Sequence, residues 1–318
     1  MAIVLLAPVY GTSRAQRTRV IRIGILATPT PEAWEPRLVW FKQALASRGY
    51  VEGQDYVLVP RFANNNIDQL DSLAAELVRL KPDLIATIGA APTKAVMNQT
   101  GTIPIVVIGA GDPVGSGLVK SLARPGGNVT GTSNSFTDLT PKTLQLLRDT
   151  VRDLSRIAVL VLPGQASHQQ VVRTMHTLAP GIGIRVIPVE IPSARELEQG
   201  FRTMTHQGAQ AVVVAHASIF LGLKRQLAEL CLANRLAGAS FAPEYADAGL
   251  LIGYGPDPVE FYNRTAYFID RILKGASPAD LPVEQPTKFE FALNLRTARA
   301  LGISVPQALR LRADRIIE

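Results

Sequence analysis

Short runs of apolar and β-branched residues alternate with helical patterns along the first half of the chain. Leu38, Phe41 and Leu45 recur at helical spacing after the first run. Gly49 then ends this stretch as a C-terminal breaker. Strands that alternate with helices predict a parallel sheet covered by helices. The four runs of strand length are residues 22–26, 56–62, 84–88 and 103–110.

The same alternation begins again in the second half, which predicts a second α/β unit of similar design. Its strand-length runs are residues 156–162, 184–191, 211–216 and 239–243. At 318 residues, the chain has the length of about two domains. We therefore expect an α/β protein of two Rossmann-like lobes with parallel sheets.

Three segments have the composition of connections between the lobes. Residues 124–136 are rich in Gly, Thr, Ser and Asn, residues 249–258 contain turn residues, and residues 276–286 are rich in proline. Three crossings predict a hinge, and two-lobed proteins with a hinge commonly close around a ligand. The expected N-terminal lobe comprises residues 19–131 with 254–275, and the expected C-terminal lobe comprises residues 132–253 with 276–318.

The first 18 residues differ in character from the rest. An apolar stretch over residues 2–9 is followed by small and polar residues, which is typical of the end of a secretory signal peptide. No Lys or Arg precedes the stretch, so an ordinary buried strand is the alternative. We expect residues 1–18 to be a signal-peptide remnant of an exported, soluble, periplasmic protein.

The charge and cysteine content exclude few functions. The chain has 33 Lys+Arg against 26 Asp+Glu, a net charge of +7, but no run of basic residues or interleaved aromatic residues indicates nucleic-acid binding. Cys231 is the one cysteine. It falls on an apolar helical stripe, which predicts a small buried hydrophobe.

The familiar catalytic and cofactor motifs are missing. The four histidines form no H-E-x-x-H pattern, and we expect them at the surface. The sequence has no phosphate-binding loop and no nucleophile elbow. The Gly spacing in "GAGDPVGSG", residues 109–117, does not fit a dinucleotide-binding turn. We therefore expect no catalytic residues, no metal and no cofactor.

The turn after the third strand is the first candidate for ligand binding. The stretch "LIATIGAAPTKAV", residues 84–96, ends a strand and begins a helix, and a helix N-terminus offers free N–H groups to a carboxylate or phosphate. A tight connection without a ligand is the alternative. The candidate ligand-binding residues at this and the other strand ends are Thr28, Ala90, Ala91, Thr93, Asp112, Ser133, Asn134, Phe136, Ser218, Phe220, Glu244, Tyr245 and Tyr254.

Several of these candidates also have a purely structural interpretation. Ser218 suits a helix cap, Asp112 suits a turn brace, and Phe220 suits a core position. The functional interpretation rests on their shared place at strand ends, where α/β sheets bind ligands.

Two long blocks closely resemble the substrate-binding proteins of bacterial ABC importers. They are "DPVGSGLVKSLARPGGNVTG", residues 112–131, and the stretch from "YGPDPVEF" to "ARALGI", residues 254–303. The branch they resemble includes binders of tryptophan and related aromatic amino acids. The resemblance implies a type I periplasmic-binding fold, no enzymatic activity, and a membrane permease and its ATPase as partners, with the binding protein a monomer.

In such relatives the turn that matches "GAAPTKA", residues 89–95, commonly receives the ligand's carboxylate. Relatives often have Gly-Thr where this chain has Gly89-Ala90, so one hydroxyl is lost. The resemblance therefore implies that the protein captures a small carboxylate ligand, either an amino acid or an aromatic or hydrophobic organic acid. We expect Asp112 or Glu244 to meet an ammonium group and an aromatic side chain to cover the apolar body. A ligand-sensing domain or an α/β enzyme acting on a small carboxylate is the alternative.

Overall fold

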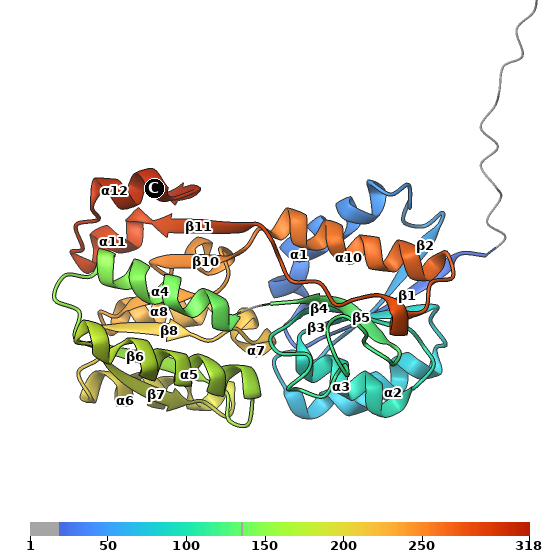
Figure 1. Cartoon of the computed structure of the whole chain (residues 1–318), viewed down its shortest axis with the longest axis horizontal. Helices are drawn as coiled ribbons and strands as arrows, with labels where there is room; N and C mark the ends of the chain where they lie inside the picture. The colour runs from blue at the N-terminus through green and yellow to red at the C-terminus, as the bar shows by residue number, and fades with distance from the viewer. Residues whose placement is uncertain (1–18, 135) are drawn as a thin grey trace, which may run out of the picture.

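The computed structural model describes residues 19–134 and 136–318, arranged as two α/β lobes side by side (Figure 1). The expected signal segment, residues 1–18, lies outside the described residues. Each lobe has a central sheet with helices on both faces, so the fold class expected from the sequence is confirmed.

The first lobe contains a parallel sheet of five strands in the order β2-β1-β3-β4-β5. The strands are β1 (Ile21–Ala27), β2 (Tyr56–Phe62), β3 (Leu84–Ile88), β4 (Ile105–Ala110) and β5 (Val129–Ser133). Its helices are α1 (Pro31–Ala46), α2 (Leu70–Arg79), α3 (Ala90–Gln99) and, from later in the chain, α10 (Pro258–Leu273), with short 3₁₀ turns η1 (Ile67–Gln69) and η4 (Pro278–Asp280). Apolar clusters fill both faces of this sheet.

The second lobe contains seven strands in the order β12-β11-β10-β9-β8-β6-β7. They are β6 (Arg156–Val161), β7 (Arg185–Glu190), β8 (Ala211–Val214), β9 (Ala237–Ser240), β10 (Ile252–Pro256), β11 (Phe289–Asn294) and β12 (Arg315–Ile317). Its helices are α4 (Phe136–Thr150), α5 (Ala166–Leu178), α6 (Leu197–His206), α7 (Ser218–Gly222), α8 (Lys224–Ala233), α9 (Glu244–Asp247), α11 (Leu295–Leu301) and α12 (Gln307–Arg312), with 3₁₀ turns η2 (Pro180–Ile182) and η3 (Ala194–Glu196).

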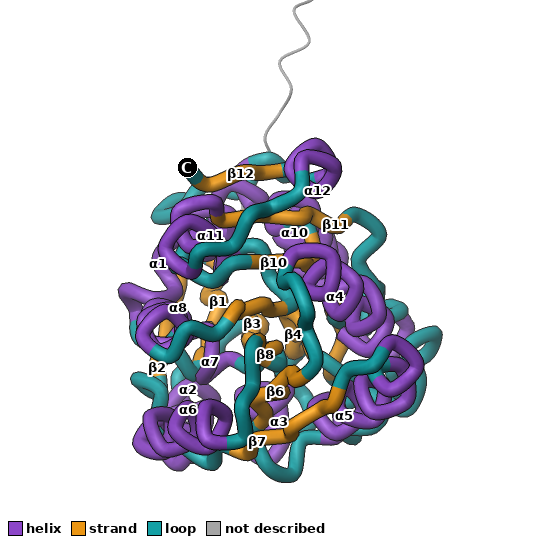
Figure 2. Tube along the Cα trace, turned by 90° about the vertical axis from the view of Figure 1, so that its left-hand side faces the viewer, coloured by secondary structure: helices purple, strands orange, loops and turns teal. Residues whose placement is uncertain are grey.

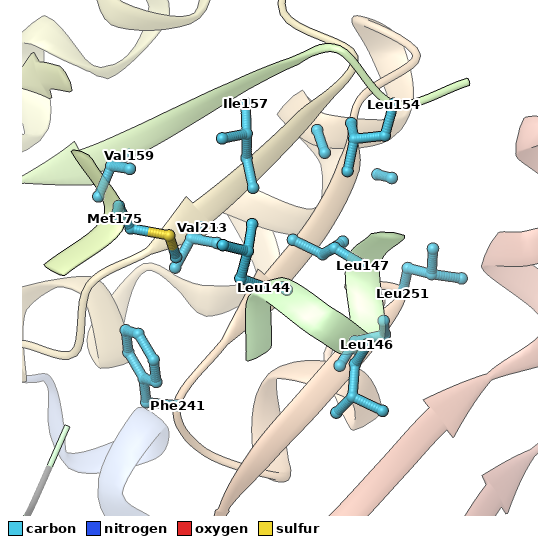
Figure 3. Close-up of a cluster of buried hydrophobic side chains, with 14 of the residues drawn as sticks. Leu144, Leu146, Leu147, Leu154, Ile157, Val159, Met175, Val213, Phe241 and Leu251 are labelled. Atoms are coloured by element: carbon cyan, nitrogen blue, oxygen red, sulfur yellow. The ribbon is translucent and has the colours of Figure 1, made fainter. Parts of the chain in front are cut away.

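Helices cover the two faces of the seven-stranded sheet in pairs. Seen from the end of this lobe, α4 and α5 lie on one side of the strands and α6 and α8 on the other (Figure 2). Residues of α4, among them Leu144 and Leu147, pack with Ile157, Val213 and Leu251 in the core on the first side (Figure 3). Cys231 lies in the core on the other side, so its prediction as a buried hydrophobe is confirmed.

Most of the expected strands are confirmed, with small shifts at their ends. Residues 56–62 and 84–88 match β2 and β3, whereas residues 239–243 overlap β9 only in part. The sequence patterns missed β5, β10, β11 and β12, and β11 runs antiparallel to β10. Among the described residues, no helix combines the length and the apolar character needed to cross a bilayer.

The structure also locates two of the three expected crossings. β10 pairs within the second sheet, and the next helix, α10, packs on α1, β4 and β5 of the first lobe, so the chain crosses near Asp257. Leu281 and Val283 pack in the cores of the first lobe, and Glu284 forms a bridge to Thr132. We therefore propose lobe limits near Asp257 and Glu284 rather than at residues 254 and 276.

Candidate ligand site

A cleft of about 890 Å³, counted with the space open to solvent, lies between the lobes. The walls are formed mainly by loops at the C-terminal ends of parallel strands from both sheets, with α1 and α10 contributing further side chains. This position matches the expectation for ligand sites in α/β sheets, where loops after the strands converge.

The N-terminus of α3 forms part of the first-lobe wall. Gly89 precedes the helix with φ at 80°, a conformation that favours glycine, and no side chain caps the first turn. Ala90 and Ala91 line the cleft with small side chains. Pro92 has no N–H group and the Gly89 N–H donates to the Ile108 carbonyl at 3.0 Å, so the N–H groups of Ala90 and Ala91 are the ones at this helix start that can bind an anion.

Thr93 lies behind this turn and not in the cleft wall. Its side chain is fully buried, and its hydroxyl donates to the Gly89 carbonyl at 2.7 Å. The Thr93 hydroxyl oxygen also lies 2.7 Å from the hydroxyl oxygen of Thr87 on β3. Thr93 therefore braces the turn that presents Ala90 and Ala91.

Thr28 and Asn134 each bring to the cleft a buried polar atom that has no hydrogen-bond partner among the described residues. The Thr28 hydroxyl follows β1, and the Asn134 Oδ1 atom follows β5. Thr28 is 1% exposed and Asn134 is 6% exposed, and both line the cleft. Buried polar atoms without partners carry an energetic cost that a ligand can relieve.

Arg37 on α1 and Glu244 at the start of α9 form an ion pair across the cleft. Arg37 donates from Nε to Oε1 at 2.9 Å and from Nη2 to Oε2 at 2.7 Å. Burial alone would lower the pKa of Arg37, but the charge of Glu244 and its hydrogen bonds outweigh burial and raise that pKa. The guanidinium therefore stays charged, and the pair brings no net charge to the cleft.

Two further contacts connect the lobes. The Ser218 hydroxyl, in the first residue of α7, donates to the Ile88 carbonyl at 2.7 Å. Lys224 Nζ donates to the Ala33 carbonyl at 3.4 Å. With the Arg37–Glu244 pair, these contacts hold the lobes in a closed arrangement.

Two histidines support the second-lobe wall; the expected surface position is wrong for His168, which is buried, whereas His216 is partly exposed in the cleft. His168 is 1% exposed, and its ring accepts from the Leu162 N–H at 2.8 Å and lies 3.2 Å from the His216 carbonyl. His216 itself lines the cleft. Burial lowers the pKa of His168 to about 4. Burial, then the charge of Arg37 and His168, lowers the pKa of His216 to about 3, so both rings are neutral at pH 7.

The rest of the lining is largely apolar. Phe241 and Ile219 come from the second lobe, and Ile88, Ile108 and Phe261 come from the first. A ligand with an apolar body suits this surface, because its burial removes apolar area from water.

Of the remaining candidates, those whose side chains the structure describes lie outside the main cleft. Asp112 and Ser133 line a neighbouring cavity, and Asp112 accepts from the Gly115 N–H at 2.8 Å as a turn brace. Phe220 and Tyr245 are fully buried in the second-lobe core, where Phe220 stacks on His168. Tyr254 packs on Phe289. The side chain of Phe136 lies outside the described residues.

The structure thus brings together Thr28, Ala90, Ala91, Asn134, Ser218 and Glu244 from the sequence candidates. Sequence reasoning missed Arg37, His216, Phe241, Phe261 and Tyr262, which also line the cleft. Arg37 lies within a helical stretch, where a charged residue suggests a solvated face. Only its pairing with a residue 207 positions away identifies it.

The described residues contain no cluster of three or more His, Cys, Asp or Glu side chains suited to hold a metal ion. The polar groups of the cleft can bind and orient a ligand through a helix N-terminus, an amide and a hydroxyl.

Comparisons with known proteins agree with this geometry. A family model described as ABC transporter substrate binding protein matches residues 33–317. A protein named "Tyrosine-binding protein" from Clostridioides difficile (strain R20291) is 26% identical over 276 residues, which are 87% of this chain and 78% of that protein.

Solved structures share the fold. A conserved domain protein from Vibrio cholerae and an ABC domain in complex with L-Trp from Streptococcus pneumoniae each superpose with a TM-score of 0.85 at 22% identity, covering 94% of this chain and 100% of theirs. The ligand-free, open structure of a substrate-binding protein with adhesive properties from Clostridium difficile has a TM-score of 0.66 at 24% identity, covering 94% of this chain and 99% of that one.

Proposed function

The chain belongs to the ABC transporter substrate binding protein family, and on that premise we propose that its interlobe cleft captures a small ligand with a carboxylate and an apolar body. The family assignment confirms the resemblance of residues 112–131 and 254–303 to ABC importer binding proteins. The protein is a solute-binding protein with the type I periplasmic-binding fold, and proteins of this family deliver their ligands to a membrane permease.

The observation that carries the ligand class is the uncapped N-terminus of α3 in the wall of a largely apolar cleft. The first-turn N–H groups beside Ala90 and Ala91 suit a carboxylate, because the helix end carries a partial positive charge. Phe241 and Phe261 suit the apolar body. The binding of tyrosine and L-Trp by the relatives that carry those names supports an aromatic side chain.

Capture proceeds by closure of the lobes. In the open state the ligand contacts one lobe, and closure then adds the contacts from the other lobe and excludes water. The ligand shifts the equilibrium only by the extra affinity it has for the closed state. The permease then recognises the two lobe surfaces as they are arranged in that state.

We further propose that the protein acts in the periplasm as a monomer, does not bind nucleic acid, and passes its ligand on unchanged. A thermal-shift screen of the full chain tests the ligand class, since a ligand that binds only the folded state raises the unfolding midpoint. The panel contains aromatic amino acids, their deaminated acids, aliphatic amino acids and uncharged sugars. Midpoint rises confined to carboxylates support the proposal, and a rise with sugars alone contradicts it.

A further inference from the structure

The side-chain amide of Asn134 has a fixed orientation in the cleft. Its Nδ2 group donates to the Gly109 carbonyl at 3.3 Å, and a carbonyl can only accept, so the NH₂ group must face Gly109. The Asn134 backbone is fixed as well, because its N–H donates to the Ala110 carbonyl at 2.8 Å. The Oδ1 atom is therefore a pure acceptor whose position is set by two anchors.

Gly109 makes room for this arrangement. It has φ at 71°, and a Cβ atom there would lie 2.5 Å from Asn134 Nδ2. A larger residue at this position would displace the amide, so the glycine and the asparagine fit each other.

The Asn134 Oδ1 atom has no donor among the described residues, although the side chain is only 6% exposed. A buried acceptor without a donor is costly, and the cost disappears when a ligand brings an N–H or O–H group. Thr28, whose side-chain oxygen is also unpartnered in the wall, has a hydroxyl that can donate or accept. Of Thr28 and Asn134, only Asn134 has an unpartnered oxygen that can do nothing but accept from a donor.

The expected carboxylates are poorly placed to meet an ammonium group. Asp112 lies in the neighbouring cavity and accepts from Gly115. Both oxygens of Glu244 accept from Arg37, which also balances its charge.

We infer that Asn134 is a specificity-determining residue whose Oδ1 atom accepts a hydrogen bond from the ligand's amino group. The inference rests on the proposed function, in which the α3 N-terminus holds the carboxylate. Asn134 then distinguishes an amino acid from the same acid without its amino group, because a site built around a hydrogen bond strongly rejects a ligand that lacks the partner.

Calorimetric titrations of the full chain with three matched pairs test this role. The pairs are L-tryptophan with indole-3-propionate, L-tyrosine with 3-(4-hydroxyphenyl)propionate, and L-phenylalanine with 3-phenylpropionate. For the pair that binds tightest, we expect the amino acid to bind about 10- to 100-fold more tightly than its deaminated partner. In Asn134→Leu this ratio falls to within about threefold of unity, and the change lies mainly in the amino acid's affinity.

Two further variants separate ligand recognition from folding. Asn134→Asp keeps an acceptor, so it retains the preference for the amino acid even where overall affinity changes. Asn128→Leu removes a partly buried amide that donates to the Thr100 and Ile103 carbonyls and does not line the cleft, so it leaves the ratio unchanged. Circular dichroism confirms that each variant is folded.

Three outcomes overturn the inference. Equal affinity of the unaltered protein for both members of a pair means that no group of the protein recognises the ligand's amino nitrogen. A parallel loss of both ligands in Asn134→Leu, with the ratio kept, assigns Asn134 a purely structural role at the hinge. If none of the six compounds binds the unaltered protein, the proposed ligand class fails and the inference fails with it.

Discussion

Arg37 and Glu244 come from different lobes and meet through two hydrogen bonds of 2.9 Å and 2.7 Å in the cleft wall. Their side chains are 11% and 12% exposed, so the pair is largely removed from water. Opening of the lobes must separate these charges. The closed arrangement of the lobes therefore depends on this ion pair in the cleft wall.

Charge reversal at this pair should control closure. Arg37→Glu places two carboxylates in the closed wall, and we expect ligand affinity to fall by at least about 100-fold, since loss of one partner of a buried pair typically costs about 3–5 kcal/mol and each 1.4 kcal/mol is tenfold. Small-angle scattering should show a more open shape with saturating ligand. The double variant Arg37→Glu/Glu244→Arg should recover at least half of the lost binding free energy. A double variant that binds the ligand no more tightly than Arg37→Glu would contradict the coupling.

Gly89 should tolerate no side chain. Gly89→Ala forces a left-handed conformation, which costs about 1–2 kcal/mol, and its Cβ atom would lie 2.8 Å from the Ser218 hydroxyl of the other lobe. We expect a lower unfolding midpoint and about tenfold weaker ligand binding. Gly49→Ala is the matched control, because Gly49 has φ at 82° and a Cβ atom there would meet nothing within 4 Å. The control should lose stability and keep its ligand affinity; loss of affinity in both variants would refute the interlobe clash.

Stability should fall in mild acid because His168 is buried in its neutral form. In the unfolded chain a histidine has a pKa near 6.5, whereas burial lowers the pKa of His168 to about 4. The unfolded state therefore binds more protons between these values, so the free energy of unfolding is highest above pH 6.5 and falls as the pH decreases toward 4. The slope per histidine is at most about 1.4 kcal/mol per pH unit.

The lowered pKa of His216 adds to this decrease in the free energy of unfolding. Urea titrations between pH 4 and pH 8 measure that free energy. The groups around His216 are Arg37 and His168, whose charges disfavour its protonation, with the Tyr245 ring 6.3 Å away. His168→Gln keeps one acceptor and one donor without a proton to gain, so it should flatten the pH dependence. Exposed His206→Gln is the control and should leave the profile unchanged. An unaltered profile in His168→Gln would exclude the proposed cause.

The Cys231 thiol should be inert in the folded protein. Burial raises the pKa of this thiol well above its usual range, and the side chain is only 2% exposed. The thiolate is the reactive form, so alkylation by iodoacetamide at pH 8 should proceed only as fast as the protein opens. Rapid labelling under native conditions would contradict the packing of α8 on its sheet.

Sequence patterns predicted the fold better than the site. β2 and β3 coincide with their predicted ranges, because parallel buried strands are continuous apolar runs bounded by turns. β11 was not predicted, because it follows a proline-rich segment and joins its sheet by an antiparallel pairing with β10.

The site depends on contacts that no local pattern contains. Ala90 and Ala91 could be predicted to face a ligand, because a strand-to-helix turn is visible in the sequence. Arg37 could not, because its role arises only when closure brings it to Glu244. Thr93 was predicted to bind ligand and instead lies behind the wall, since its hydroxyl finds the Gly89 carbonyl.

A comparison of one ligand with its carboxamide tests the central claim most directly. Calorimetric titration of the full chain with the tightest-binding amino acid and with its α-carboxamide changes only the group that should meet the α3 N-terminus. The proposed carboxylate site predicts at least about tenfold weaker binding of the carboxamide, because a neutral amide forfeits the charge-assisted hydrogen bonds of the first turn. Equal affinities for the two compounds would contradict it.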